Sequence, residues 1–309
     1  MTASSHPLLP PGVVVLERGW LSSNNVVLRG EDEAAVVDSG YWTHSEQTLA
    51  LLAAAAGGLP IRTLVNTHLH SDHCGGNAAL QACYPELRTL IPPGQAPSVR
   101  NWDPVALTYE PTGQHCPPFR LDGVLEPGST LRLGERHWQV HAAPGHDPHS
   151  VVLFEPSSRA LISADALWEN GFGVVFPELE GEAAFHEVAG TLDLIEDLAP
   201  AVVVPGHGSL FTEVGIALES ARSRLRAYQE NPKRHAAHAA KVLIKFKLLE
   251  LQSVRVNELL EWCAHARYFQ LVRERWFPEE EPGPWTESLL QDLVRGHAAA
   301  RSGEFLVNT

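Results

Sequence analysis

Hydrophobic and polar positions in the first 210 residues form short runs that are typical of β-strands. The runs are rich in Val, Ile and Ala and are bounded by residues that favour turns. The pattern predicts strands over Val13–Leu16, Asn25–Leu28, Ala34–Val37, Arg62–Asn66, Trp138–His141, Val151–Phe154, Ala160–Ser163 and Ala201–Val204. Strands therefore dominate the early part of the chain.

A helical spacing of apolar positions lies between these strands. It predicts helices over Thr43–Ala56, Gly76–Cys83, Ala183–Leu198 and Thr212–Gln229. The segment Pro92–Pro127 is rich in Pro and has no clear period, so we expect a long loop or lid there. Strands followed by β-α alternation indicate an α/β sandwich in which helices cover the sheets.

The pattern becomes helical after Asn231 and Pro232. It predicts helices over Ala236–Leu251, Val254–Trp276 (one or two) and Thr286–Ala300, with an acidic loop at Pro278–Pro284. The charge changes at the same point, because residues 1–230 hold 12 Arg, no Lys and 27 acidic groups, whereas residues 231–309 hold 11 basic and 10 acidic groups. We therefore expect one domain over residues 1–230 and a small helical domain over residues 231–309.

Composition limits the partners and the compartment. The formal charge of −14 makes nucleic acid and anionic membranes unfavourable partners. Residues 1–12 lack the features of a signal peptide, and no window has the apolar length of a membrane span. The four cysteines have irregular spacing, which does not indicate a disulfide framework. We expect a cytoplasmic protein that acts on a small molecule.

The run from Thr67 to His73 carries the candidate chemistry. It reads Thr-His-Leu-His-Ser-Asp-His and directly follows a predicted strand. His68 and His70 alternate on an extended backbone, so both side chains can reach one ion. Asp72 and His73 lie past the turn and can face a second ion, and the glycines that follow allow a tight turn into the next helix. Three imidazoles and a carboxylate at this density predict a metal site.

Further donors follow later strands on short turns. His146 lies in Pro-Gly-His, Asp165 in Ala-Asp and His207 in Pro-Gly-His-Gly. Side chains at strand ends converge on one rim of a sandwich. The seven donors then divide into two sites. The expected sets are His68, His70 and His146 for one ion, Asp72, His73 and His207 for the other, and Asp165 as the bridge.

These elements together resemble the signature of the metallo-β-lactamase fold superfamily, including its glyoxalase II-like and lactamase-B2-like branches. The matching positions are Asp38, the His68-x-His70-x-Asp72-His73 run, His146, Asp165 and His207. The resemblance covers residues 13 to about 210. It implies an αβ/βα four-layer sandwich with a dinuclear metal site at one edge. It is not specific for a substrate.

Departures from known members narrow the choice. Secreted lactamases of the largest subclass have Cys at the position of Asp165 and no ligand at that of His73. This chain has candidate ligands at both positions, which counts against an antibiotic-degrading enzyme. Glyoxalase II has Gly-His-Glu-Tyr around its last His, whereas this chain has Gly-His-Gly-Ser at 206–209. A relative of glyoxalase II is therefore favoured over a strict hydroxyacylglutathione hydrolase.

The expected reaction is hydrolysis of an ester-like bond (thioester, lactone or related acyl substrate) by a metal-bridging hydroxide. Two divalent metal ions would supply this hydroxide. We expect Zn first, with Fe or Mn as alternatives. Asp72 would orient the hydroxide and accept its proton, and Asp38 would hold a ligand in place from behind.

Three other functions stay open. A persulfide dioxygenase would use one iron, held by the equivalents of His68, His146 and Asp165. The tail is similar in placement to the winged-helix-like tail of lactamase-B2-like proteins, some of which cut single-stranded RNA. We expect Lys241, Lys245 and Lys247 to form a solvated face instead, and the tail to act as a lid or as a homodimer contact. A non-catalytic binding module is the third alternative.

Substrate selection is expected from the loops around the rim. The candidate segments are Tyr41-Trp42, Trp168–Phe176 and Pro92–Pro127. Their aromatic residues favour an acyl or ring-bearing substrate of low charge.

Overall fold

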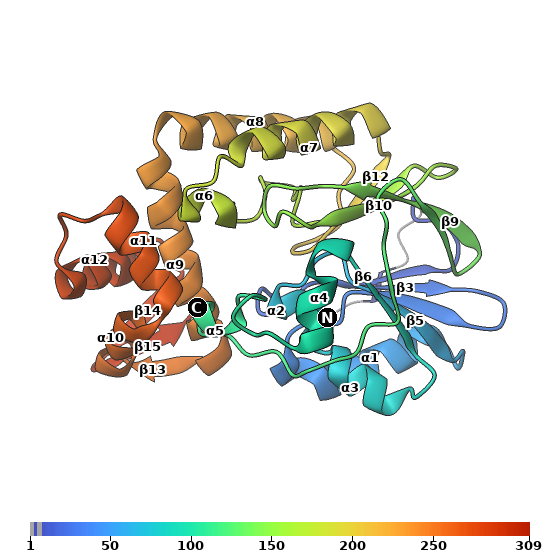
Figure 1. Cartoon of the computed structure of the whole chain (residues 1–309), viewed down its shortest axis with the longest axis horizontal. Helices are drawn as coiled ribbons and strands as arrows, with labels where there is room; N and C mark the ends of the chain where they lie inside the picture. The colour runs from blue at the N-terminus through green and yellow to red at the C-terminus, as the bar shows by residue number, and fades with distance from the viewer. Residues whose placement is uncertain (1–2, 5–7) are drawn as a thin grey trace.

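The computed structural model describes residues 3–4 and 8–309 and consists of a four-layer body with a smaller unit at one end (Figure 1). One sheet has seven strands in the order of the chain. These are β1 (Ala3–Ser4), β2 (Val13–Leu16), β3 (Asn25–Arg29), β4 (Ala34–Val37), β5 (Ile61–Val65), β6 (Arg88–Ile91) and β7 (Gly123–Val124). Pairing is antiparallel from β1 to β4 and parallel from β4 to β7.

The second sheet has five strands in the order β12-β11-β10-β9-β8. Its strands are β8 (Thr130–Leu133), β9 (Arg136–Ala142), β10 (Val151–Glu155), β11 (Ala160–Ala164) and β12 (Val202–Pro205). Only β11 and β12 pair in parallel. The parallel pairs β4–β5 and β11–β12 each direct their carboxyl ends to one edge, and the site described below lies there.

The two sheets face each other across one apolar core. Val26, Val37 and Val65 contribute to it from the first sheet, and Val140 and Ile162 from the second. Alternate side chains of a strand point to opposite faces, so each sheet also needs a cover on its outer face.

Helices supply both outer covers, as Figure 1 shows. The first sheet is covered by α1 (Ser45–Ala56), preceded by the short helix η1 (Trp42–His44), and by α3 (Asn77–Cys83). The second is covered by α7 (Phe185–Leu198) and α8 (Val214–Glu230). The prediction of an αβ/βα sandwich is therefore confirmed.

The segment 92–127 is more ordered than the predicted loop. It contains η2 (Pro93–Gln95), α4 (Ala96–Asn101), α5 (Tyr109–Thr112) and the strand β7. Leu107, Tyr109 and Phe119 are buried together with Leu69 and Ile91. The segment is thus a long connection interrupted by short elements, and its apolar side chains, though they follow no regular period, pack onto the body.

Gly75 and Gly76 follow α2 (Ser71–Cys74), and their backbone is helical, with φ of −60° and −82°. The predicted tight turn into the next helix is present at Gly75–Gly76, but it needs no left-handed backbone. A Cβ on Gly75 would lie 2.5 Å from the Ser71 carbonyl oxygen, and one on Gly76 would lie 2.4 Å from that of Ser39. Glycine is required here because another backbone segment passes too close for a side chain.

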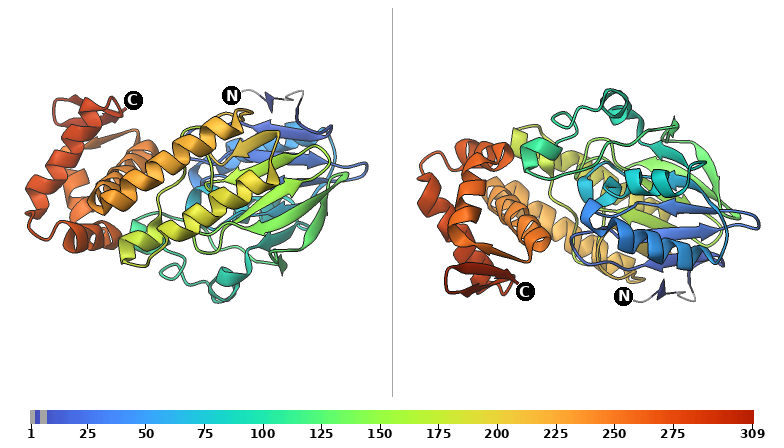
Figure 2. Two further views of the ribbon diagram at one scale, coloured as in Figure 1. Left: turned by 90° about the horizontal axis from the view of Figure 1, so that it is seen from above. Right: turned by 90° about the horizontal axis from the view of Figure 1, so that it is seen from below.

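The residues after 231 form a unit with its own core. Its helices are α9 (Pro232–Leu251), α10 (Val256–His265), α11 (Arg267–Trp276) and α12 (Pro282–Arg295). Asn231 begins α9 by accepting a hydrogen bond from the Arg234 backbone N–H, and Pro232 follows it. Apolar side chains of all four helices pack together, and Figure 2 shows the unit at one end of the body.

This unit also contains a small sheet, which the sequence pattern did not predict. Its strands β13 (Ser253–Arg255), β14 (Ala299–Ser302) and β15 (Phe305–Asn308) lie in the order β13-β15-β14. Val254 and Ala300, expected at helix ends, lie in strands instead. The unit thus combines helices with an antiparallel hairpin, the content expected of a winged-helix-like domain.

The predicted solvated face of lysines was wrong. The Lys241 ammonium lies 3.3 Å from Asp292 Oδ2, and that of Lys247 donates to Glu250. Lys245 donates to the Ala298 carbonyl at 2.6 Å and to Asn308. Lys241 and Lys245 therefore tie α9 to α12 and to the end of the chain, whereas the Lys247–Glu250 pair lies within α9. No helix in the described part of the chain combines the length and apolar character needed to cross a membrane.

Candidate metal centre

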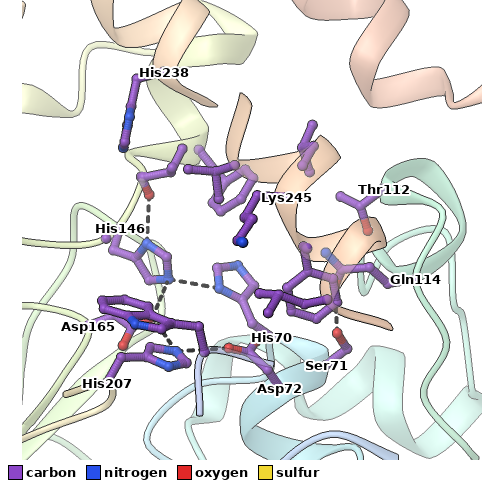
Figure 3. A pocket seen from close by; sticks show the side chains of 18 of the residues that line it. His70, Ser71, Asp72, Thr112, Gln114, His146, Asp165, His207, His238 and Lys245 are labelled. Atoms are coloured by element: carbon purple, nitrogen blue, oxygen red, sulfur yellow. Dashed lines mark hydrogen bonds and ion pairs between the residues drawn. The ribbon is translucent and has the colours of Figure 1, made fainter. Parts of the chain in front are cut away.

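Seven predicted donors meet at one edge of the sandwich. They come from the ends of strands in both sheets: His68 and His70 follow β5, Asp72 and His73 lie in α2, His146 follows β9, Asp165 follows β11, and His207 follows β12. Figure 3 shows five of them side by side. Residues 139 positions apart in the sequence thus share one site because their strands end at the same edge.

The first group consists of three imidazoles. His70 Nδ1 lies 3.1 Å from His68 Nε2 and 2.8 Å from His146 Nε2. His146 Nδ1 donates to the Val174 carbonyl at 2.6 Å, so in the neutral ring Nε2 carries a lone pair. Tetrahedral Zn–N bonds of 2.0–2.1 Å place ligand nitrogens about 3.3 Å apart. The three nitrogens therefore fit around one ion.

The second group consists of Asp72, His73 and His207. Asp72 Oδ2 lies 3.0 Å from His207 Nε2 and 3.8 Å from His73 Nε2. His73 is fully buried, and its Nε2 makes no hydrogen bond with any described residue. A buried nitrogen without a partner is costly unless an ion takes its lone pair.

Asp165 lies between the two groups. Its Oδ2 is 3.4 Å from His146 Nε2, 3.5 Å from His73 Nε2 and 3.8 Å from His207 Nε2. One carboxylate oxygen therefore faces imidazoles of both groups. This is the position that a bridging ligand would need.

The electrostatics of the cluster suit cations. Burial, followed by the neighbouring imidazoles, lowers the pKa of His68 well below its ordinary value and that of His70 to about 4, so both rings are neutral. Burial alone would raise the pKa of Asp72 and Asp165, but the imidazoles beside them hold both below their ordinary values. The cluster thus offers lone pairs and ionised carboxylates.

The surroundings of His73 also favour a positive charge. Burial would lower its pKa, yet Asp165, Asp38 and Asp72 raise it well above the ordinary value. Three carboxylates around one ring favour a positive charge there, and a divalent ion would neutralise them more completely than one proton. The donors therefore fit metal ions.

Asp38 lies behind this ring. Its Oδ2 accepts from His73 Nδ1 at 2.8 Å, which leaves His73 Nε2 directed at the site. The same carboxylate accepts from the backbone N–H and the hydroxyl of Thr67, at 2.9 and 2.8 Å. Asp38 thus orients one donor and fixes the start of the run that carries the others.

Two tryptophans enclose the cluster. The Trp168 indole N–H donates to Asp165 Oδ1 at 3.1 Å, so the oxygen of Asp165 that faces away from the imidazoles is satisfied. The Trp20 ring stacks on His207 with its centroid 5.3 Å away. Trp20 is 55% exposed and therefore forms part of the mouth of the site.

A cavity of about 510 Å³ opens onto the donors. Figure 3 shows the donors on one side and α9 on the other. Apart from the donors, most of the wall is aromatic or aliphatic. It includes Trp20, Tyr109, Trp168, Val174, Phe176, Val242, Leu243, Phe246 and Leu249. This volume and lining suit a small apolar group.

Two of the three predicted specificity segments line the cavity. They are the segment 168–176 and, from the segment 92–127, residues 108–114. Tyr41 does not line it: its side chain is fully buried and contacts Phe246 edge to face at 5.1 Å. It supports the wall from behind, so the expectation for Tyr41 was wrong.

The sequence predicted a lid or a homodimer contact from the C-terminal domain, but not which helix would cover the site; in the structure α9 lines the cavity. Ile244 and Leu248 face the core of the C-terminal unit, Phe246 and Leu249 face the cavity, and Leu243 contacts both. A helix that is apolar on two faces has two neighbours, and this pattern could have indicated a second contact. Trp20 carries no comparable signal in the sequence.

Comparisons with known proteins agree with this geometry. The family model described as "Metallo-beta-lactamase superfamily" matches residues 18–207. A hydroxyacylglutathione hydrolase of Synechococcus sp. (strain JA-3-3Ab) is 30% identical over 62% of this chain, and the match spans 65% of that relative's own length. The acyl-coenzyme A thioesterase MBLAC2 of Gallus gallus is 26% identical over 67% of this chain and 81% of its own.

Solved structures share the fold. A metallo-beta-lactamase family protein of Thermus thermophilus superposes with a TM-score of 0.58 at 20% identity, covering 97% of this chain and 99% of that one. A beta-lactamase domain protein of Burkholderia ambifaria gives the same score and identity over 97% of this chain and 93% of its own. In both cases the similarity extends into the C-terminal unit.

Proposed function

Because the chain belongs to the metallo-β-lactamase superfamily, we propose that it is a hydrolase which uses two divalent metal ions to cleave an ester-like bond of a small acyl substrate. The observation that carries the proposal is the cluster of seven donors at the wall of an apolar cavity. Thioesters come first in the substrate class, followed by lactones and related acyl compounds. The hydrolase names of the two relatives above support this order.

In this proposal His68, His70 and His146 hold one ion, and Asp72, His73 and His207 hold the other. Asp165 is shared between them. Zinc is favoured because five of the seven donors are imidazoles. Iron and manganese accept the same ligands, and one structural neighbour, 26% identical, is a di-iron-bound form.

When bound, such ions lower the pKa of a water molecule and polarise the oxygen of the scissile carbonyl. The chain's own residues would orient the water and transfer its proton. The ionised Asp72 lies at the cavity wall and can orient the attacking water and accept its proton. The oxygen of the water joins the acyl carbon, the carbon–sulfur or carbon–oxygen bond breaks, and the leaving group departs with a proton.

The alternatives fit less well. A dioxygenase with one iron would need only His68, His146 and Asp165, and it would leave Asp72, His73 and His207 without a purpose. A non-catalytic module would have no use for seven converging donors. An RNA nuclease would need an open groove for single-stranded RNA, whereas the donors here face a cavity lined mainly by apolar side chains.

The proposal also includes location and partners. All four cysteines are free thiols, and the cytoplasm is the compartment that suits this state. The partner is a small molecule, and a homodimer through the C-terminal unit remains part of the proposal.

Elemental analysis combined with a panel of phosphate-free thioesters, lactones and esters tests the function. We expect two metal ions per chain in the parent and fewer in His68→Ala and Asp165→Ala, with kcat/KM at least about 100-fold lower in both variants. Replacement of the exposed His137 by Ala is the control and should change neither value. Folded donor variants that retain full activity on every substrate would refute the proposal, and less than one metal per parent chain would favour a binding module.

A further inference from the structure

A second hollow adjoins the cavity on the side of α8 and α9. It has a volume of about 630 Å³, and its wall carries Arg224, Arg234 and Lys241. Ser220 and Ser223 contribute hydroxyl groups, and no carboxylate lines it, although Lys241 is paired with Asp292 beside it. We call this hollow the cationic groove.

The charge of the two arginines is not neutralised by the rest of the chain. Within the described residues, neither the Arg224 nor the Arg234 guanidinium makes a hydrogen bond or an ion pair. Arg222, also on α8, lies instead within 2.8 Å of both Asp193 and Glu196. Acidic groups are abundant in a chain of charge −14, so guanidinium groups without a carboxylate around one hollow point to an anionic ligand.

The groove adjoins the cavity at the metal centre. Arg224 and His238 line both spaces. The Arg224 guanidinium passes directly over Gly171, where a Cβ would lie 2.6 Å from it, so the loop after Trp168 leaves room for this side chain. Burial, followed by Arg224, Lys241 and Arg234, lowers the pKa of His238 to about 4. A neutral ring and a guanidinium therefore form the border between an apolar and a cationic compartment.

We propose that the cationic groove binds phosphate groups on the leaving portion of the substrate, so that the substrate is an acyl thioester or ester of a phosphate-bearing carrier. This inference rests on the proposed function. The acyl chain would lie against Tyr109, Phe246 and Leu249, with its carbonyl at the donors and the carrier leaving past His238. The expectation of a substrate of low charge then holds only for the acyl portion.

Two thioesters with the same octanoyl group test the inference, one on coenzyme A and one on phosphate-free N-acetylcysteamine. In the parent, KM should be at least about tenfold lower for the coenzyme A thioester than for the N-acetylcysteamine thioester, because charge-assisted contacts to phosphate stabilise only the former. In the double variant Arg224→Gln/Arg234→Gln this advantage should disappear, because KM for the coenzyme A thioester should rise at least about tenfold more than KM for the N-acetylcysteamine thioester.

Arg226→Gln is the matched control, because Arg226 is an exposed arginine of the same helix outside the groove. It should leave both KM values unchanged. Equal KM values for the two thioesters in the parent, or a parallel rise for both in the double variant, would overturn the inference while leaving the hydrolase itself intact.

Calorimetric binding of coenzyme A gives a readout that does not need turnover. The parent should bind it with an affinity that falls as salt rises, and the double variant should lose at least about tenfold in affinity. No binding by the parent would overturn the inference. Tighter binding of a single-stranded RNA oligonucleotide, lost in the same double variant, would also overturn it and assign the groove to a nuclease.

Discussion

Asp38 orients the candidate metal ligand His73 without being one of the seven candidate ligands itself. Its backbone has a φ of 57°, in the left-handed region that few residues other than Gly, Asn and Asp adopt readily. This conformation accompanies a carboxylate that serves both Thr67 and His73. The sequence indicated a role behind the donors, but not which donor Asp38 holds, because that depends on how β4 and β5 align.

Asp38→Asn should weaken metal binding at His73. Asn tolerates the backbone conformation, but its amide can donate to Nδ1, which moves the ring proton to Nε2 and blocks the lone pair there. We expect one of two metal affinities to fall about 10–100-fold, measured by competition with a chromophoric chelator. The exposed Asp32→Asn serves as the control of equal charge, and two unchanged affinities would contradict this role for Asp38.

Among the elements, the strands of the sandwich were predictable to within a residue or two, since β2 and β4 have the predicted bounds. The two-residue strands β1 and β7 were missed, and so were β6 and β8. β8 is an edge strand in which polar and apolar residues alternate, and β6 (Arg-Thr-Leu-Ile) has only two apolar residues, so neither has an apolar run. The order within the segment 92–127 was also missed, because it comes from contacts with Leu69 and Ile91 rather than from a local period.

Gly76→Ala should destabilise the junction between α3 and the turn that carries Asp38. The new Cβ would meet the Ser39 carbonyl oxygen at 2.4 Å, and backbone cannot give way as a flexible side chain can. We expect the free energy of unfolding, measured with urea, to fall by about 1–3 kcal/mol.

Gly190→Ala is the matched control, since Gly190 lies within α7 and a Cβ there would meet nothing within 4 Å. It should raise the free energy of unfolding by about 0.5–1 kcal/mol, because alanine favours a helix. An equal effect of the two substitutions would show that close approach at Gly76 does not matter.

For the whole molecule, the donor run and the family were predictable, whereas the cavity was not. Seven donors on recognisable turns made the cluster visible in the sequence, because each follows a strand end. The cavity wall depends on how α9 lies against residues 108–114 and 168–176. Such long-range packing leaves little trace in local spacing.

Metal removal should loosen the sandwich as a whole, because the donors come from both sheets and their ions would join them. A chelator should therefore lower Tm, since a ligand at 1,000 times its Kd stabilises the folded chain by about 4 kcal/mol. Differential scanning calorimetry measures the shift. The chelator should lower the Tm of Asp165→Asn by less than it lowers the Tm of the parent. A Tm of the parent that does not change with the chelator would contradict metal binding between the two sheets.

The division of the cavity between two parts of the chain has a consequence for substrate selection. All candidate donors precede residue 208, whereas α9, which faces them, belongs to the residues after 231. Substitutions in α9 can therefore change the shape of the cavity, and with it the acyl groups that fit, without changing any candidate donor.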